Sequence, residues 1–70
     1  MEGLPESVRA RRRALGLSQG ELAALAGVSE RWIRALEQGK RTVRLDSLVA
    51  VLDGLGLELQ LVPRGPRASE

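Results

Sequence analysis

The side chains available for chemistry in this 70-residue chain are arginine, lysine, serine and carboxylates, because the sequence contains no His, Cys or Tyr. Their absence excludes disulfides, thiolate and imidazole catalysis, and Cys/His zinc sites. Asp46 and Asp53 are seven residues apart, about 10.5 Å along a helix, with no third ligand nearby. We therefore expect no enzyme, no metal site and no cofactor.

The basic residues are unevenly distributed along the chain. The net charge is only +2, but arginines and a lysine gather within residues 9–13 and 31–44, while Asp46, Asp53 and Glu58 follow them. A basic end opposite an acidic end indicates a polyanionic partner on one side. The guanidinium fork suits phosphate and guanine in particular.

Two helix signatures joined by a short turn organise the middle of the sequence. Ser18 is a strong N-cap, and Glu21 three residues later completes a capping box. Gly27 ends this first helix, Ser29 caps the next one, and Gly39 ends it. Two short helices with so little chain between them must cross sharply, which predicts the helix-turn-helix of DNA-binding domains.

The predicted fold is mainly α, with four to five short helices around the helix-turn-helix and one C-terminal β-strand. The expected helices span residues 5–15, 19–26, 30–38 and 45–55. Thr42 is the expected cap of the last helix, whose apolar stripe comprises Leu45, Leu48, Val49, Leu52 and Leu55. The expected organisation is a flexible N-terminus (1–4), a DNA-binding domain (5–56), a dimerisation strand (57–62) and a disordered tail (63–70).

The motif comprises Leu17-Ser18-Gln19, Glu21-Leu22-Ala23, Gly27-Val28-Ser29, Ile33, Leu36-Glu37 and Gly39-Lys40. In these residues and their spacing it resembles the lambda-repressor/Cro-like helix-turn-helix domains, the Xre family. With the flanking helices the resemblance covers residues 5–56. It implies a sequence-specific, DNA-binding transcriptional repressor.

The second helix of such a motif enters the major groove. Ile33 and Leu36 define its inward face, and Arg31 is best placed for a bidentate contact to guanine. The residues expected to read bases are Glu30, Arg31, Arg34 and Ala35. The residues expected to bind the DNA backbone are Gln19, Ser29, Gln38, Lys40, Arg41 and Arg44.

Trp32 and Arg12 lie near this region with roles of their own. Trp32 falls at the border of the inward face, so both packing and contact with a sugar or thymine methyl stay open. Arg12 shares the apolar face of the first helix with Val8 and Leu15, and a buried guanidinium needs a partner. Glu37 is the expected partner, and an Arg–Glu pair at the matching positions recurs in the family that the motif resembles.

The segment after the last helix has the period of a strand. Leu57, Leu59 and Leu61 alternate with Glu58 and Gln60, as in a half-buried strand. Nothing else in the sequence reads as a strand, so we expect pairing with a second copy, a homodimer and an inverted-repeat operator on double-stranded DNA. A helix-turn-helix followed by a strand resembles HipB-type antitoxins. That resemblance implies the autoregulator of a toxin–antitoxin operon and a HipA-type kinase toxin as partner.

Two further expectations concern partners and location. The alternative function is a protein-interaction module that keeps the fold without reading DNA, and it predicts an acidic or apolar surface around Arg31, Arg34 and Lys40. No apolar run approaches the ~20 residues that span a bilayer, and the start lacks a secretory apolar segment. We expect a cytoplasmic protein without a membrane partner.

Overall fold

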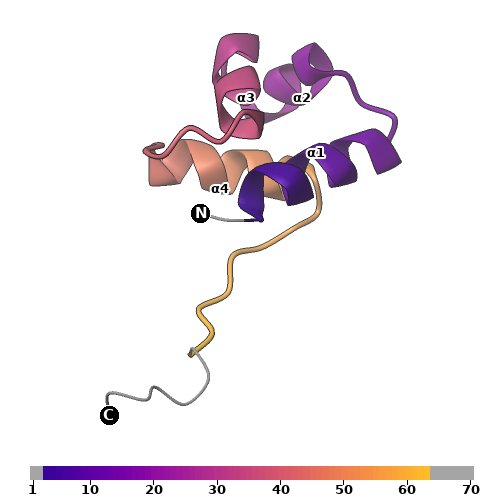
Figure 1. Ribbon diagram of the computed structural model, residues 1–70. Coiled ribbons are helices and arrows are strands. Elements are labelled where there is room, and N and C mark those ends of the chain that lie inside the picture. The colour runs from indigo at the N-terminus through magenta and orange to yellow at the C-terminus, as the bar shows by residue number, and fades with distance from the viewer. Residues whose placement is uncertain (1–2, 64–70) are drawn as a thin grey trace.

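Four helices make up the ordered framework of residues 3–63, the part of the chain that the computed structural model describes. They are α1 (Leu4–Ala14), α2 (Gln19–Ala26), α3 (Glu30–Glu37) and α4 (Leu45–Gly54). α2 packs against both α3 and α4, and α1 packs against α3, so that α2 and α3 lie together on one side of α1 and α4 (Figure 1). The predicted mainly α fold is confirmed within these residues. None of these four helices has the length and apolar character needed to cross a membrane.

Local hydrogen bonds fix the beginning of α2 and of α3. The Ser18 hydroxyl accepts from the Glu21 amide at 3.0 Å, and the Glu21 carboxylate accepts from the Ser18 amide at 2.7 Å, which is the predicted capping box. The Ser29 hydroxyl accepts from the Trp32 amide at 3.0 Å. Gly27 ends α2 with a φ of 73°, a left-handed conformation that glycine adopts without strain. The turn between the two helices is therefore set by residues close in sequence.

The ends of the other helices differ slightly from the prediction. α1, α3 and α4 each end one residue early, because Leu15, Gln38 and Leu55 are C-caps. The prediction that Thr42 caps α4 is wrong. The N-cap is Arg44, whose side chain makes no cap hydrogen bond. These differences move the boundaries without changing the order of the helices.

Aliphatic side chains from all four helices form the core. Its buried members are Val8, Leu22, Ala23, Ile33, Leu36, Leu48, Val51, Leu52 and Leu55. Three residues that the sequence placed inward, Leu15, Leu45 and Val49, are instead 45%, 66% and 40% exposed. The buried residues of α4 are Leu48, Val51 and Leu52, followed by its buried C-cap Leu55. Leu45 and Val49 lie beside this stripe and form an outer apolar surface on α4.

The chain after α4 runs away from the helices (Figure 1). Leu57 packs against the core, and its amide donates to the Leu52 carbonyl at 2.8 Å. Residues 58–63 are exposed and make no backbone–backbone hydrogen bond with the rest of residues 3–63. The predicted strand over 57–62 is thus not formed in this single chain, where its backbone groups have no neighbouring strand.

The predicted flexible N-terminus (1–4) and disordered tail (63–70) lie largely outside the described residues. Leu4 is an exception, because it is the first residue of α1.

Candidate nucleic-acid interface

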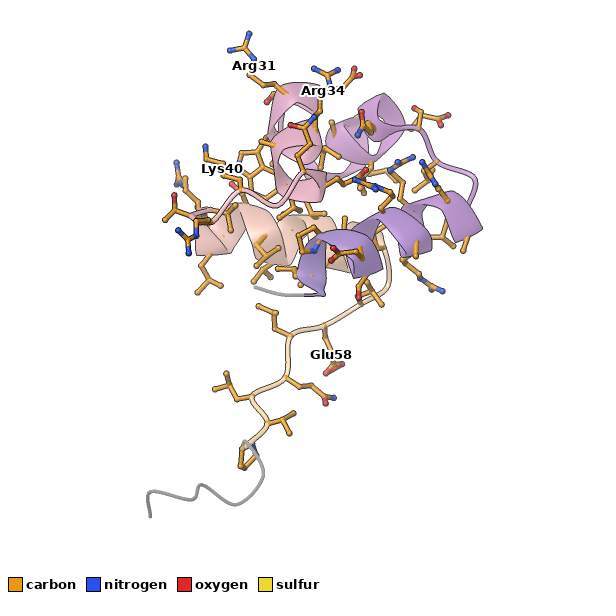
Figure 2. All side chains as sticks on the ribbon, in the orientation of Figure 1. Arg31, Arg34, Lys40 and Glu58 are labelled. Atoms are coloured by element: carbon orange, nitrogen blue, oxygen red, sulfur yellow. The ribbon has the colours of Figure 1, made fainter. Side chains whose placement is uncertain are left out.

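The exposed face of α3 and the loop that follows it form a basic surface. Ile33 and Leu36 are fully buried and hold the opposite face of α3 on the core. Figure 2 shows Arg31 and Arg34 pointing away from the other helices, with Lys40 on the loop nearby. This is the arrangement by which the second helix of a helix-turn-helix presents side chains to the major groove.

The four residues predicted to read bases lie together on α3. Glu30, Arg31 and Arg34 are exposed, and Ala35 is half-buried. The Arg34 guanidinium donates to the Glu30 carboxylate at 3.1 Å, so Glu30 holds Arg34 in place. Arg31 makes no ion pair with any residue between 3 and 63, and its donors are available to a base edge.

Ser29 and Gln19, which are predicted to bind the DNA backbone, already make hydrogen bonds within the protein. The Ser29 hydroxyl accepts from the Trp32 amide. The Gln19 side-chain nitrogen donates to the Glu37 carboxylate at 3.2 Å, so a phosphate would meet the second hydrogen of the same amide. Both residues lie at the N-terminal ends of the two motif helices, where backbone N–H groups favour an anion.

The other backbone-binding candidates surround the C-terminal end of α3. Gln38, Lys40 and Arg41 are exposed, as the prediction requires. Arg44 donates to the Asp46 carboxylate at 2.8 Å, in an exposed pair. The hydrogen bond from Arg44 lowers the pKa of Asp46, with help from the Ser47 amide. Arg44 would have to exchange this carboxylate for a phosphate.

A buried cluster around Glu37 holds the motif to α1. Arg12 donates to both carboxylate oxygens of Glu37, at 2.7 and 3.0 Å, which confirms the predicted pair. Burial alone would raise the pKa of Glu37, but hydrogen bonds from Arg12 and Gln19, together with the charges of Arg12 and Arg9, outweigh it and lower that pKa. For Arg12, the hydrogen bond to Glu37 raises the pKa of the guanidinium and outweighs its burial, which would lower that pKa. Both side chains are therefore charged, and Glu37 links α1, α2 and α3.

Arg9 and Arg11 have roles that the sequence pattern did not predict. Arg9 donates to the Glu37 carbonyl at 2.8 Å, and Arg11 donates to the Leu55 carbonyl at 2.8 Å. Both carbonyls lie at helix C-termini, which have orphan acceptors that arginine side chains can satisfy. The available signal was the surplus of arginines on α1, combined with two helix C-termini whose last carbonyls need donors.

Within residues 3–63, no three acidic side chains come together as metal ligands would. The surface offers instead cationic donors and helix N-termini, which bind anions.

The fold and the basic surface define a helix-turn-helix domain, and the chain belongs to that family, whose model matches residues 6–64. It is 40% identical over 60 residues to the uncharacterized HTH-type transcriptional regulator y4mF of Sinorhizobium fredii, covering 86% of this chain and 79% of that protein. A second regulator of that organism, y4dL, is 38% identical over 63 residues, and the chain covers 32% of its length.

A regulator of Haemophilus influenzae is also similar, with 38% identity over 52 residues. The chain spans 53% of the Haemophilus protein, so it corresponds to only part of that protein and of y4dL. The family supports the prediction of a non-enzymatic helix-turn-helix protein.

Proposed function

We propose that this chain is a sequence-specific, DNA-binding transcriptional repressor. The observation that carries the proposal is the exposed basic face of α3, where Arg31 and Arg34 point outward from a helix fixed by Ile33 and Leu36. Membership of the helix-turn-helix family and similarity to proteins named as HTH-type transcriptional regulators support the same function. Occupancy of a promoter would exclude polymerase.

The competing function, a protein-interaction module, requires a different surface. It predicts acidic or apolar side chains where Arg31, Arg34 and Lys40 are exposed. The one acidic residue on this face of α3, Glu30, is paired with Arg34. The charge of the surface favours a polyanion.

The repressor is proposed to act as a homodimer through residues 57–62. Leu59, Leu61 and Val62 are 47%, 101% and 74% exposed in the single chain. The outer apolar surface of α4 is also uncovered. Pairing of two such segments would satisfy their backbone groups, cover Leu59 and Leu61 on one face, and present two copies of α3 to an inverted repeat.

The finer proposal is an antitoxin that represses its own operon. It is supported by the helix-turn-helix followed by an alternating segment, the pattern in which the sequence resembles HipB-type proteins. The expected partner is a HipA-type kinase toxin. Co-expression with a kinase encoded by the neighbouring gene tests this, and a stable complex that also binds the shared promoter is the expected result.

Footprinting on the promoter of the protein's own gene tests the repressor function directly. A protected inverted repeat, with half-sites about one helical turn (~34 Å) apart, is the expected result. If no site in the promoter is protected at protein concentrations below those that cover random DNA, sequence-specific binding is contradicted.

Arg31→Ala should weaken binding to the operator by roughly 1–3 kcal/mol and relax preference at one base pair. The reason is that Arg31 is exposed on α3 and makes no ion pair within residues 3–63. Competition binding with single-base operator variants measures the preference. Arg13→Ala removes the same charge from the exposed surface of α1 and is the control. Equal losses on operator and random DNA would make Arg31 only a backbone anchor.

Replacing Lys40 and Arg41 together by alanine should weaken binding to all duplexes alike. These exposed cations follow α3 and are proposed to neutralise phosphates. Each lost phosphate contact should make the slope of log K against log salt shallower by about 0.9. Titrations of operator and random duplex across a range of salt concentrations measure both slopes. An unchanged slope would show that the two side chains do not contact phosphate.

A further inference from the structure

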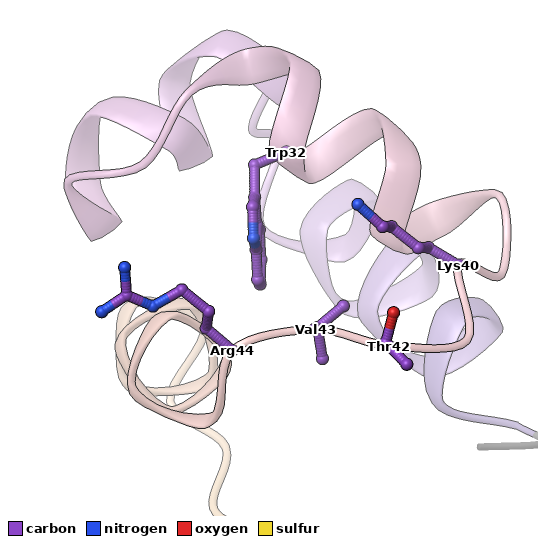
Figure 3. Close-up of a pocket in the computed structure, with 5 residues that line it drawn as sticks. All are labelled: Trp32, Lys40, Thr42, Val43 and Arg44. Carbon is purple, nitrogen blue, oxygen red and sulfur yellow. The ribbon is translucent and has the colours of Figure 1, made fainter.

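A hollow beside α3 combines an aromatic ring with cationic side chains. Trp32, Lys40, Thr42, Val43 and Arg44 line it, and its volume is about 430 Å³. Figure 3 shows the indole ring projecting from α3 toward the loop, with Lys40 on one side of it and Arg44 on the other. We call it the Trp32 hollow.

Trp32 contacts both the core and the Trp32 hollow. The residue is half-buried and packs against the core, while its ring also lines the hollow. Its amide is fixed by the Ser29 hydroxyl at the beginning of α3. Packing and ligand contact, the two alternatives that the sequence left open, are thus compatible, because different parts of one side chain serve them.

The lining specifies the chemistry of an occupant. The indole and Val43 offer apolar contact, Lys40 and Arg44 offer positive charge on either side, and Thr42 adds a hydroxyl. A matching ligand has a small apolar ring between two anionic groups. One deoxyribose with its two flanking phosphates has this pattern, and a duplex strand bordering the groove that receives α3 would carry it to the hollow.

We propose that the Trp32 hollow binds one deoxyribose of the DNA backbone, with the sugar against the indole and the flanking phosphates on Lys40 and Arg44. This deepens the proposed repressor function and rests on it. The site would fix the register of α3 in the groove without reading a base. The Arg44–Asp46 pair is exposed, and exposed pairs are weak, so a phosphate can replace the carboxylate.

Quenching of tryptophan fluorescence tests this placement directly, because Trp32 is the only tryptophan in the chain. Acrylamide, a neutral quencher, is titrated into the full chain with and without a mixed-sequence duplex at low salt. Anisotropy of a labelled duplex follows binding independently. We expect bound duplex to protect Trp32 from the quencher. Duplex binding by anisotropy with unchanged quenching would overturn the inference and leave the repressor function standing.

Two further outcomes of this experiment are decisive. No duplex binding at all would overturn both the repressor function and the inference. Stronger protection by a single-stranded oligonucleotide than by the duplex would show that the ring stacks on a base instead of a sugar.

Trp32→Leu provides a second measurement, since leucine preserves apolar packing but lacks the flat ring. Loss of part of the apolar contact with the sugar, at ~25 cal/mol per Å² of buried apolar surface, predicts roughly fivefold weaker binding to operator and random duplex alike. Leu25→Ala, which removes a 62% exposed apolar side chain from α2, is the matched control and should bind normally. Circular dichroism confirms that each variant is folded. Unchanged affinity in folded Trp32→Leu would contradict the site.

Discussion

Glu37→Leu should lower the free energy of unfolding by roughly 3–5 kcal/mol, because it leaves the buried guanidinium of Arg12 without its partner. Arg12 is only 9% exposed and gives two hydrogen bonds to this carboxylate. A domain of this size has a total stability on the order of 4–10 kcal/mol, so the variant should be marginally folded at room temperature. Urea unfolding followed by circular dichroism measures the loss.

A double-mutant cycle separates the pair from the packing around it. Arg12→Met and Glu37→Leu are measured alone and together, and the double variant should lose much less stability than the sum of the two. The exposed Glu30–Arg34 pair is the matched control, because a helical i,i+4 pair should couple by only ~0.3–0.5 kcal/mol. Additive effects at Arg12 and Glu37 would contradict the buried ion pair.

The pH dependence of stability gives a second measure of the same pair. The pKa of Glu37 is lowered in the folded state, so its charge stabilises the fold above the ordinary glutamate pKa. This contribution is lost as the pH falls below that ordinary value and through the lowered folded value. Glu37→Leu should therefore lose less stability on acidification than the unmodified chain. Equal acid sensitivity in both proteins would assign the effect to other carboxylates.

Replacing Leu59 and Leu61 together by aspartate should convert the proposed dimer into a monomer. Both side chains are exposed in the single chain and alternate with polar residues on the opposite face. Burial of four aspartates in a two-fold strand pair would be strongly unfavourable. Loss of the second half-site contact should weaken operator binding by roughly 10²–10⁴-fold. Sedimentation and operator titration measure the two effects.

This variant has advantages over truncation after Gly56, which would also remove Leu57 from the core. Gln60→Asp changes the opposite face of the same segment and is the control; it should still dimerise. The variant with aspartate at both Leu59 and Leu61 should also retain the thermal stability of an isolated helical domain. If it still sediments as a dimer, or if the unmodified protein is monomeric at tens of micromolar, the segment has another role.

The parts of the structure that the sequence predicted best depend on neighbouring residues or on a strict physical requirement. The Ser18–Glu21 capping box joins residues three apart. The Arg12–Glu37 pair joins residues 25 apart, but a guanidinium on an apolar face needs a carboxylate, and few positions could supply one.

The parts that were missed depend on how the helices cross. Arg9 and Arg11 reach carbonyls 28 and 44 residues away, and their own spacing gives no sign of those partners. The inward face of α4 was misplaced toward Leu45 and Val49. These two apolar residues follow the helical period as the buried ones do, so the sequence pattern alone does not show which of them face the core. The strand predicted over residues 57–62 is not formed in the single chain, and its pairing with a second copy stays a prediction.

The division of α3 into a fixed face and an exposed face has an evolutionary consequence. The side chains that attach the helix, Ile33, Leu36 and Glu37, are buried, while Arg31 and Arg34 contribute little to holding the fold. Because these exposed residues are proposed to read bases, mutations at their positions should alter operator preference with almost no loss of stability. After gene duplication, two copies of such a regulator could diverge to control separate genes by a few surface substitutions, while the scaffold that orients them stays the same.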